Sequence, residues 1–171
     1  EGVTTIGAEA FNCCENLTSV SFEYGTTDIG AGAFWACPAL TSVTLPDSII
    51  GINSCLFQGS GITEITIPES CKYIYDYAFN VCENLTSITI ENPECEIYDD
   101  EYTISNTAEI HGYAGSTAHA YAEKNNRNFK LLDEELISTI TRTTLSVTSK
   151  PDYSLGDVNN DGMINPYDAS L

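Results

Sequence analysis

Apolar residues recur along the first half of the chain at an interval much longer than the period of a helix or a strand. Each repeat has a leading isoleucine, a phenylalanine five residues later, and three further apolar residues in an L-x-x-L-x-L arrangement. The leading isoleucines are Ile6, Ile29, Ile52 and Ile74, spaced 23, 23 and 22 residues apart. Periods of about 20–29 residues are typical of leucine-rich repeats, in which each repeat forms one coil of a solenoid.

The end of each repeat alternates apolar and polar residues, which predicts a short strand. In the first repeat Val20 and Phe22 face inward, because alternate side chains of a strand point to opposite faces. The same pattern predicts strands near 41–45, 63–67 and 86–90, and all are rich in the Thr, Val and Ile that strands favour. A single coil cannot bury its apolar edge, so stacked coils are expected to share one core.

The outward positions of these strands predict a flat face rich in hydroxyl groups. They are Ser19, Ser21, Ser42, Thr44, Glu64, Thr66, Ser87 and Thr89. This face has no Trp, Tyr or Arg to anchor a protein partner and no ring on which a sugar would stack. The aromatic residues Trp35, Tyr73, Tyr75 and Tyr77 lie elsewhere in the repeats. They either form a binding edge on the convex side or simply cover the flank of the solenoid.

Three of the seven cysteines share one position of the repeat. Cys14, Cys37 and Cys82 occupy it, and Ser60 stands near that place in the third repeat. Equivalent residues of adjacent coils lie about 4.8 Å apart, so a ladder of small buried thiols is expected. The alternative is a reactive or metal-binding thiol, although the chain has no C-x-x-C pair and no zinc-like spacing of Cys and His. The cysteines off this ladder are Cys13, Cys55, Cys71 and Cys95.

The charge is strongly acidic, with 25 acids against 6 bases and a net charge of -19. Phosphate binding depends on Lys and Arg, so this surface is expected to repel nucleic acid and anionic lipid. The chain has no run of 18 apolar residues, and we expect no membrane insertion. The densest acidic run, over 91–101, predicts a solvated loop, with a weak cation site as the alternative.

The repeats carry a specific family resemblance. The pattern Ile-x-x-x-Ala-Phe-x-x-Cys-x-x-Leu-x-x-Val-x-Ile, followed by Pro46 and Pro68, resembles the BspA-like leucine-rich repeats of bacterial surface proteins. The segment 110–126 resembles the closing cap of that family. The resemblance implies a β-rich, right-handed leucine-rich-repeat solenoid with short helical turns and a helical C-terminal cap, over residues 1–132.

The cap segment also predicts a helix from its own spacing. Ala118, Tyr121 and Ala122 recur at helical intervals, and Ser116 or Thr117 is a suitable N-cap. The only histidines of the chain, His111 and His119, are expected to be ordinary cap residues and not catalytic groups.

The composition changes after residue 132. Residues 133–154 are predicted to form a Ser/Thr-rich linker, and residues 155–171 carry a calcium-loop motif. Calcium prefers six to eight oxygen ligands from alternating loop positions, and Gly162 allows the sharp turn. The expected Ca²⁺ ligands at positions 1, 3, 5, 7, 9 and 12 are Asp157, Asn159, Asp161, Met163 through its carbonyl, Asn165 and Asp168. A chance acidic loop is the alternative.

The opening Gly-Asp-Val-Asn-x-Asp-Gly, with Asp168 where an EF-hand has Glu, resembles a type I dockerin. The resemblance implies calcium-dependent binding to a cohesin domain of a cellulosome scaffold. It places the partner contacts at Pro166 and Tyr167, where many dockerins have a hydroxyl pair, which leaves the cohesin type open. The segment 155–171 corresponds to the first half of a dockerin, with one calcium loop and the start of its helix.

Together these patterns predict a secreted, non-enzymatic binding protein. The tail would dock to a cohesin, and the repeats would contact a protein or carbohydrate ligand. The alternative is a free surface adhesin that acts through the repeats alone. A Ser-His-Asp arrangement, an H-E-x-x-H motif, a P-loop and a nucleophile elbow are all missing from the sequence, so catalysis is not expected. The opening Glu1-Gly2-Val3 resembles the middle of a repeat, so a fragment of a longer protein is expected.

Overall fold

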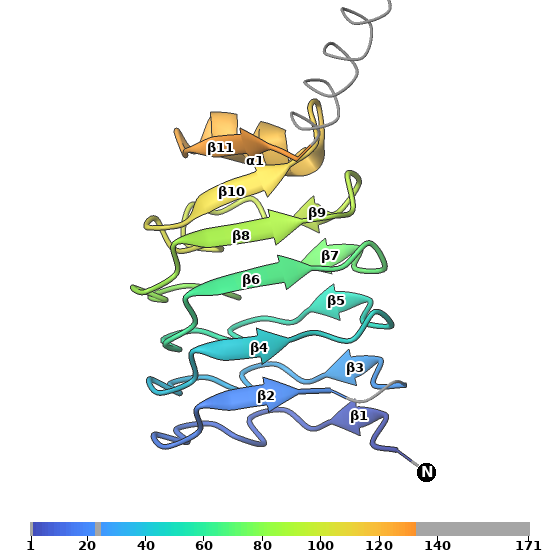
Figure 1. The fold of residues 1–171 in the computed structure, drawn as a ribbon, viewed down its shortest axis with the longest axis vertical. Helices are drawn as coiled ribbons and strands as arrows, with labels where there is room; N and C mark the ends of the chain where they lie inside the picture. Colours follow the sequence, from blue (N-terminus) through green and yellow to red (C-terminus); the bar gives the residue numbers. More distant parts are fainter. Residues whose placement is uncertain (1, 23–24, 133–171) are drawn as a thin grey trace, which may run out of the picture. The chain divides into compact units, whose positions relative to one another are not determined.

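A computed structural model describes residues 2–22 and 25–132 of the chain. These residues form a solenoid of stacked coils, each of which passes through a longer strand, a short strand and a set of turns (Figure 1). The predicted leucine-rich-repeat solenoid is therefore confirmed.

The longer strands lie side by side on one side of the solenoid, which we call the strand face. They are β2 (Ser19–Ser21), β4 (Ser42–Thr44), β6 (Glu64–Ile67), β8 (Ser87–Ile90), β10 (Glu109–Gly112) and β11 (Phe129–Leu131). All pairings are parallel, with β2 on β4 and with β6, β8, β10 and β11 in one sheet. The predicted strands and their inward residues are confirmed, and Ile65, Ile67, Ile88 and Ile90 are buried.

A second side of the solenoid is built from strands of two residues. They are β1 (Thr5–Ile6), β3 (Asp28–Ile29), β5 (Gly51–Ile52), β7 (Tyr73–Ile74) and β9 (Glu96–Ile97). β1 pairs with β3, and β7 lies between β5 and β9, again in parallel. The leading isoleucines of the repeats are the inward residues of this side. From Ile29 to Ile74 they are buried.

The run of acids over 91–101, which we predicted to be a solvated loop, belongs instead to another coil. Its Ile97 lies on β9, Ile104 forms a parallel bridge with Phe79, and Ile110 lies on β10. Ile104 and Ile110 are fully buried. The acids themselves are mostly exposed, as expected, but the segment is not a simple loop, because its widely spaced inward residues build a coil.

One stack of phenylalanine rings runs through the core. The ring centroids of Phe34 and Phe57 are 5.7 Å apart, those of Phe57 and Phe79 are 5.6 Å apart, and both pairs are nearly parallel. At the first coil Phe11 stacks on Phe34 at 5.4 Å but remains 41% exposed, because only one neighbouring coil covers it. The five-residue offset from each leading isoleucine thus places one ring per coil in register.

The third side of the solenoid consists of turns that need two left-handed residues per coil. Glu9, Gly32, Cys55 and Tyr77 occupy the first of these positions, and Cys13, Ala36, Gly59 and Val81 occupy the second, with φ between 52° and 68°. Glycine adopts this backbone region without the clash that a Cβ atom causes. Only two of these eight positions carry glycine, so the backbone retains local strain at the other six.

We expect Val81→Gly to raise the free energy of unfolding by about 1 kcal/mol. Val81 has φ +56° and its side chain is 53% exposed, so the change relieves backbone strain and removes little buried surface. The matched reverse change is Gly59→Val, at the same position of the preceding coil with φ +68°. Denaturant unfolding should show opposite shifts for the two variants. Shifts of the same sign would show that the turn backbone does not control these effects.

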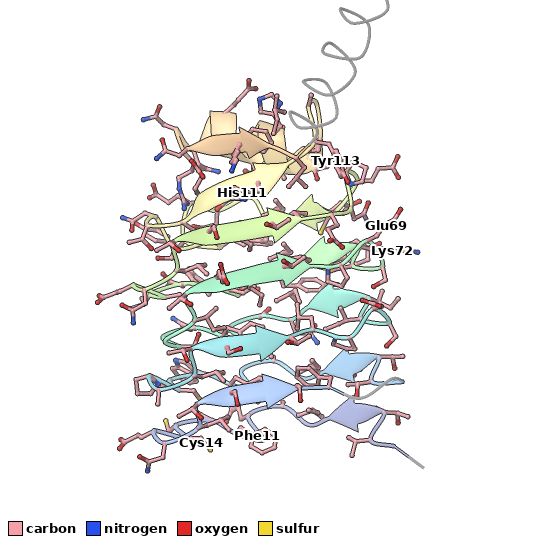
Figure 2. All side chains as sticks on the ribbon, viewed as in Figure 1. Phe11, Cys14, Glu69, Lys72, His111 and Tyr113 are labelled. Atoms are coloured by element: carbon pink, nitrogen blue, oxygen red, sulfur yellow. The ribbon has the colours of Figure 1, made fainter. Side chains whose placement is uncertain are left out.

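The predicted helical cap is α1 (Thr117–Lys124), and Ser116 is its N-cap, accepting a hydrogen bond from the backbone N of His119 at 3.2 Å. The His119 ring stacks on Phe129, with centroids 4.4 Å apart. His111 lies on β10 and pairs with Glu109 at 2.8 Å (Figure 2). Both histidines therefore make the structural contacts that we expected of cap residues.

Candidate functional site

The strand face contains a polar groove of about 680 Å³, which we call the strand-face groove. Its lining includes hydroxyl side chains of β4, β6 and β8 and three carboxylates, those of Asp47, Glu64 and Glu91. The register aligns the hydroxyls of Thr66 and Thr89 in one column and places the Glu64 carboxylate beside Ser87. No basic residue lines this groove, and no aromatic ring does either. It therefore offers hydrogen bonds and negative charge but no anchoring side chain.

A second candidate surface lies over β7 and β9, and we call it the tyrosine surface. It consists of Tyr73, Tyr75, Tyr77, Tyr98 and Tyr102, which are between 37% and 54% exposed. Sequence analysis grouped only the first three. Tyr98 and Tyr102 lie in the coil that the repeat pattern missed. The fourth aromatic residue considered with them, Trp35, is 43% exposed in the turns of an earlier coil.

The parallel register brings these tyrosines together in pairs. The backbone N atoms of Tyr75 and Tyr98 donate to the leading-strand residues of the coil before them, so the two residues hold the same position in consecutive coils. Tyr77 and Tyr102 are likewise matched, since each lies two residues before a partner of the Phe79–Ile104 bridge. Such pairs stand about one strand spacing apart, roughly 4.8 Å.

The rings of Tyr73 and Tyr75 are also neighbours, with centroids 6.0 Å apart and planes tilted by 32°. Gly51 of the previous coil lies beside them, where a Cβ would make ordinary contact with the Tyr75 ring at 3.5 Å. The five tyrosines therefore lie at matched positions of two consecutive coils, with the rings of Tyr73 and Tyr75 in closest association.

Carboxylates surround the tyrosine surface. Glu96 is in register with Tyr73 on the adjacent strand, and Asp76 stands between Tyr75 and Tyr77 in the chain. The Glu101 carboxylate interacts with the Tyr102 hydroxyl, and this contact, together with its charge, raises the pKa of Tyr102. The site thus combines ring faces with hydrogen-bond acceptors.

The cysteine ladder is present as predicted. Cys37 and Cys82 are fully buried, Cys14 is half-buried in the first coil, and Ser60 stands 3.5 Å from the Cys82 sulfur. Cys37 donates to the carbonyl of Phe11 and Cys82 to that of Phe57. Burial raises the pKa of both thiols, which opposes formation of a reactive thiolate. The two buried thiols therefore serve to pack the core.

A second buried thiol pair, Cys71 and Cys95, was not found from the sequence. Both residues are fully buried, and the side chain of Asn92 donates to the carbonyl of Cys71 at 2.8 Å. The interaction between the two thiols lowers the pKa of Cys71 and raises that of Cys95. Their spacing is longer than the repeat period, so the pattern gave no reason to align them. No group of three or more metal-ligating residues occurs in the described coils.

The predicted calcium ligands and partner contacts lie outside the described residues. They are Asp157, Asn159, Asp161, Met163, Asn165 and Asp168, with Pro166 and Tyr167. The predicted linker over 133–154 is outside them too. These assignments stay predictions.

The fold agrees with a known repeat family. Residues 4–117 match the BspA type leucine rich repeat region, in six copies. The chain belongs to this family. The six copies include the coil that the sequence pattern missed. No curated protein matches the sequence.

Two solved structures resemble these BspA-type repeats. One is a leucine rich cell surface protein of Faecalibacterium prausnitzii, with 27% identity and a TM-score of 0.54 over 81% of this chain and 32% of that one. The other is the pneumococcal vaccine antigen PcpA, with 16% identity and a TM-score of 0.56 over 76% of this chain and 42% of that one. The chain thus spans less than half the length of either protein. Within the part of the repeat protein that the structure describes, no helix is long and apolar enough to cross a bilayer.

Proposed function

We propose that this BspA-type repeat protein is a non-catalytic, extracellular or cell-surface binding protein that contacts a protein ligand through the tyrosine surface. The observation that carries the proposal is the gathering of Tyr73, Tyr75, Tyr77, Tyr98 and Tyr102, all exposed, on two consecutive coils. Tyrosine is enriched at the energetic centres of protein interfaces because it buries a large apolar ring and keeps a hydrogen-bonding hydroxyl. The cell-surface assignment is supported by the similar Faecalibacterium protein.

The strand-face groove is the weaker candidate for a protein ligand. Its lining is made of small hydroxyl side chains and carboxylates, which bind water well and bury little surface. A non-catalytic role is supported by the histidine contacts, since His111 pairs with Glu109 and His119 packs on Phe129. Neither ring is poised beside a nucleophile in this arrangement.

The proposal is tested by binding of the 171-residue chain to immobilised mucin, fibronectin, collagen and laminin, and to soluble plant polysaccharides. We expect at least one protein to bind, and Tyr75→Ala with Tyr98→Ala to weaken that binding at least tenfold, because truncated hot-spot residues cost about 2 kcal/mol or more. Tyr113→Ala is the matched control, since Tyr113 is 37% exposed and lies on the cap, outside the tyrosine surface (Figure 2). Binding that survives the double change would contradict the proposal.

We further propose that residues 155–171 form a calcium-binding docking segment for a cohesin, as their resemblance to a type I dockerin suggests. The donor set supports this, because carboxylate, amide and carbonyl oxygens stand at the spacing that Ca²⁺ requires. Asp157, Asp161 and Asp168 would supply the charge. Calcium would order the loop and so present Pro166 and Tyr167 to the partner.

The test is binding of the full gene product to a panel of cohesins, with and without EDTA. We expect EDTA to abolish binding and Asp157→Ala with Asp161→Ala to weaken it at least tenfold, since both carboxylates would ligate the metal. If no cohesin binds at micromolar concentration, the docking proposal is wrong, and the alternative of a free adhesin acting through the repeats alone is favoured.

A further inference from the structure

We infer that the tyrosine surface receives the lysine and arginine side chains of a basic segment of a partner protein. The inference rests on the proposed function and adds the chemistry of the partner. Three features of the surface carry it, namely the exposed ring faces, the surrounding carboxylates and the scarcity of competing bases.

The exposed rings supply the first feature. The face of a phenol ring is negative and attracts a cation placed within about 6 Å of its centre. The ring centroids of Tyr73 and Tyr75 are 6.0 Å apart and their planes are tilted by 32°, so the two rings are not stacked face to face. Tyr98 and Tyr102 are the most exposed of the set, at 53% and 54%. Flat cations such as guanidinium bind to surfaces of this kind by stacking.

The carboxylates supply the second feature, because they would accept the hydrogen bonds of the same cations. Glu96 lies beside Tyr73 in the next coil, and Asp76 lies between two of the tyrosines. The backbone carbonyl of Asp100 accepts a hydrogen bond from the Tyr121 hydroxyl, and one of its carboxylate oxygens accepts a hydrogen bond from the backbone N of Tyr102. Ring face and carboxylate together match both the charge and the apolar stem of Lys and Arg.

Few bases in the described coils neutralise these acids. Lys124 pairs with Asp99 at one edge. Lys72 precedes Tyr73 and extends outward from the loop between β6 and β7, near Glu69 (Figure 2). The whole chain has a net charge of -19. A basic segment would therefore be attracted over a distance, whereas a nucleic acid or an anionic lipid surface would be repelled.

The test uses the 171-residue chain and three probes in calorimetric titrations. The probes are a ten-residue peptide of alternating Arg and Ser, the same length of alternating Glu and Ser, and a neutral β-1,4-linked glucose hexamer. We expect only the Arg peptide to bind, and to bind more weakly as salt is raised, since exposed charges are screened. The double change Tyr75→Ala with Tyr98→Ala should weaken binding of the Arg peptide about tenfold, because each ring is expected to contribute about three- to fivefold.

A matched pair of charge variants separates a defined site from general attraction. Asp76→Asn with Glu96→Gln removes two charges at the tyrosine surface and should weaken the Arg peptide about fivefold. Glu64→Gln with Glu91→Gln removes two charges at the strand-face groove and should change the affinity for the Arg peptide less than twofold. Glu64, Glu91 and Glu96 are exposed, whereas Asp76 is half-buried and accepts a hydrogen bond from the Ser54 hydroxyl, so circular dichroism would verify that each variant is folded.

Three results would overturn the inference. They are equal weakening by the two charge variants, no loss with the tyrosine variant, and tyrosine-dependent binding of the glucose hexamer in place of the Arg peptide. If the Arg peptide fails to bind but the tyrosine variant no longer binds a protein ligand that the unmodified chain binds, the proposed function stands and only the inferred partner chemistry is wrong.

Discussion

Replacement of Phe57 by alanine is expected to lower the free energy of unfolding by about 4 kcal/mol. Phe57 is fully buried and its ring stacks on two others, with centroids 5.7 Å from Phe34 and 5.6 Å from Phe79. The change leaves a cavity between three coils, and in a solenoid each coil is stabilised mainly by its neighbours. Denaturant unfolding followed by circular dichroism measures the loss.

The same substitution at the end of the stack is the control. Phe11 has one stacking partner and is 41% exposed, so Phe11→Ala is expected to cost about 1 kcal/mol. Equal losses for the two variants would show that the ring stack does not couple the coils. A large loss of unfolding free energy for Phe57→Ala alone would show that the central coils contribute most of the stability.

Replacement of Arg127 by leucine is expected to lower the free energy of unfolding by about 3 kcal/mol. The guanidinium donates to the carbonyl of Ile104 at 2.9 Å, to that of Ala108 at 3.2 Å, and to that of Ser105. All three acceptor residues are buried, so their carbonyls would lose a charged donor without gaining water. Burial also lowers the pKa of Arg127, but an arginine remains charged at neutral pH.

Lys130→Leu is the control for this change, because Lys130 is an exposed base on the neighbouring β11. It should change the free energy of unfolding by less than about 0.5 kcal/mol. Unchanged stability in Arg127→Leu would mean that the cost of burying the guanidinium cancels its three hydrogen bonds. Hydrogen exchange of the backbone N of Ile110, which donates to the carbonyl of Asn128, would report whether the cap opens first.

The two surfaces have different origins in the repeat. The strand-face groove repeats the same chemistry, since Ser or Thr recurs at the outward positions of β4, β6 and β8. The tyrosine surface is confined to consecutive coils, because the equivalent of Tyr75 in the third repeat is Asn53 and that of Tyr73 is Gly51. Departures from the repeat of this kind mark a specific site on an otherwise regular scaffold.

The sequence was sufficient to predict the solenoid and much of its core. The fixed spacing of the leading isoleucines and phenylalanines predicts stacked coils, because only stacking buries all of these side chains together. The ladder of Cys37 and Cys82 followed from the same spacing and is confirmed. The cap helix followed from its own helical spacing, and the structure selects Ser116 over Thr117 as its N-cap. Local patterns such as these report which residues face the core.

The tertiary structure decided what lies outside the core. The coil over 91–112 escaped the pattern although Ile97 follows Ile74 by 23 residues, because Tyr102 replaces the phenylalanine five residues on. Pairing with the coil before it shows that Ile97 corresponds to Ile74 and Ile104 to Phe79. The match of Tyr98 with Tyr75 was open to the same 23-residue spacing, whereas that of Tyr102 with Tyr77 required the Phe79–Ile104 bridge. Positions far apart in the chain become neighbours through the parallel register, and register depends on contacts between coils rather than on periodicity within one. The sequence alone thus determined the scaffold, whereas the packing of adjacent coils determined the surface on which we place its function.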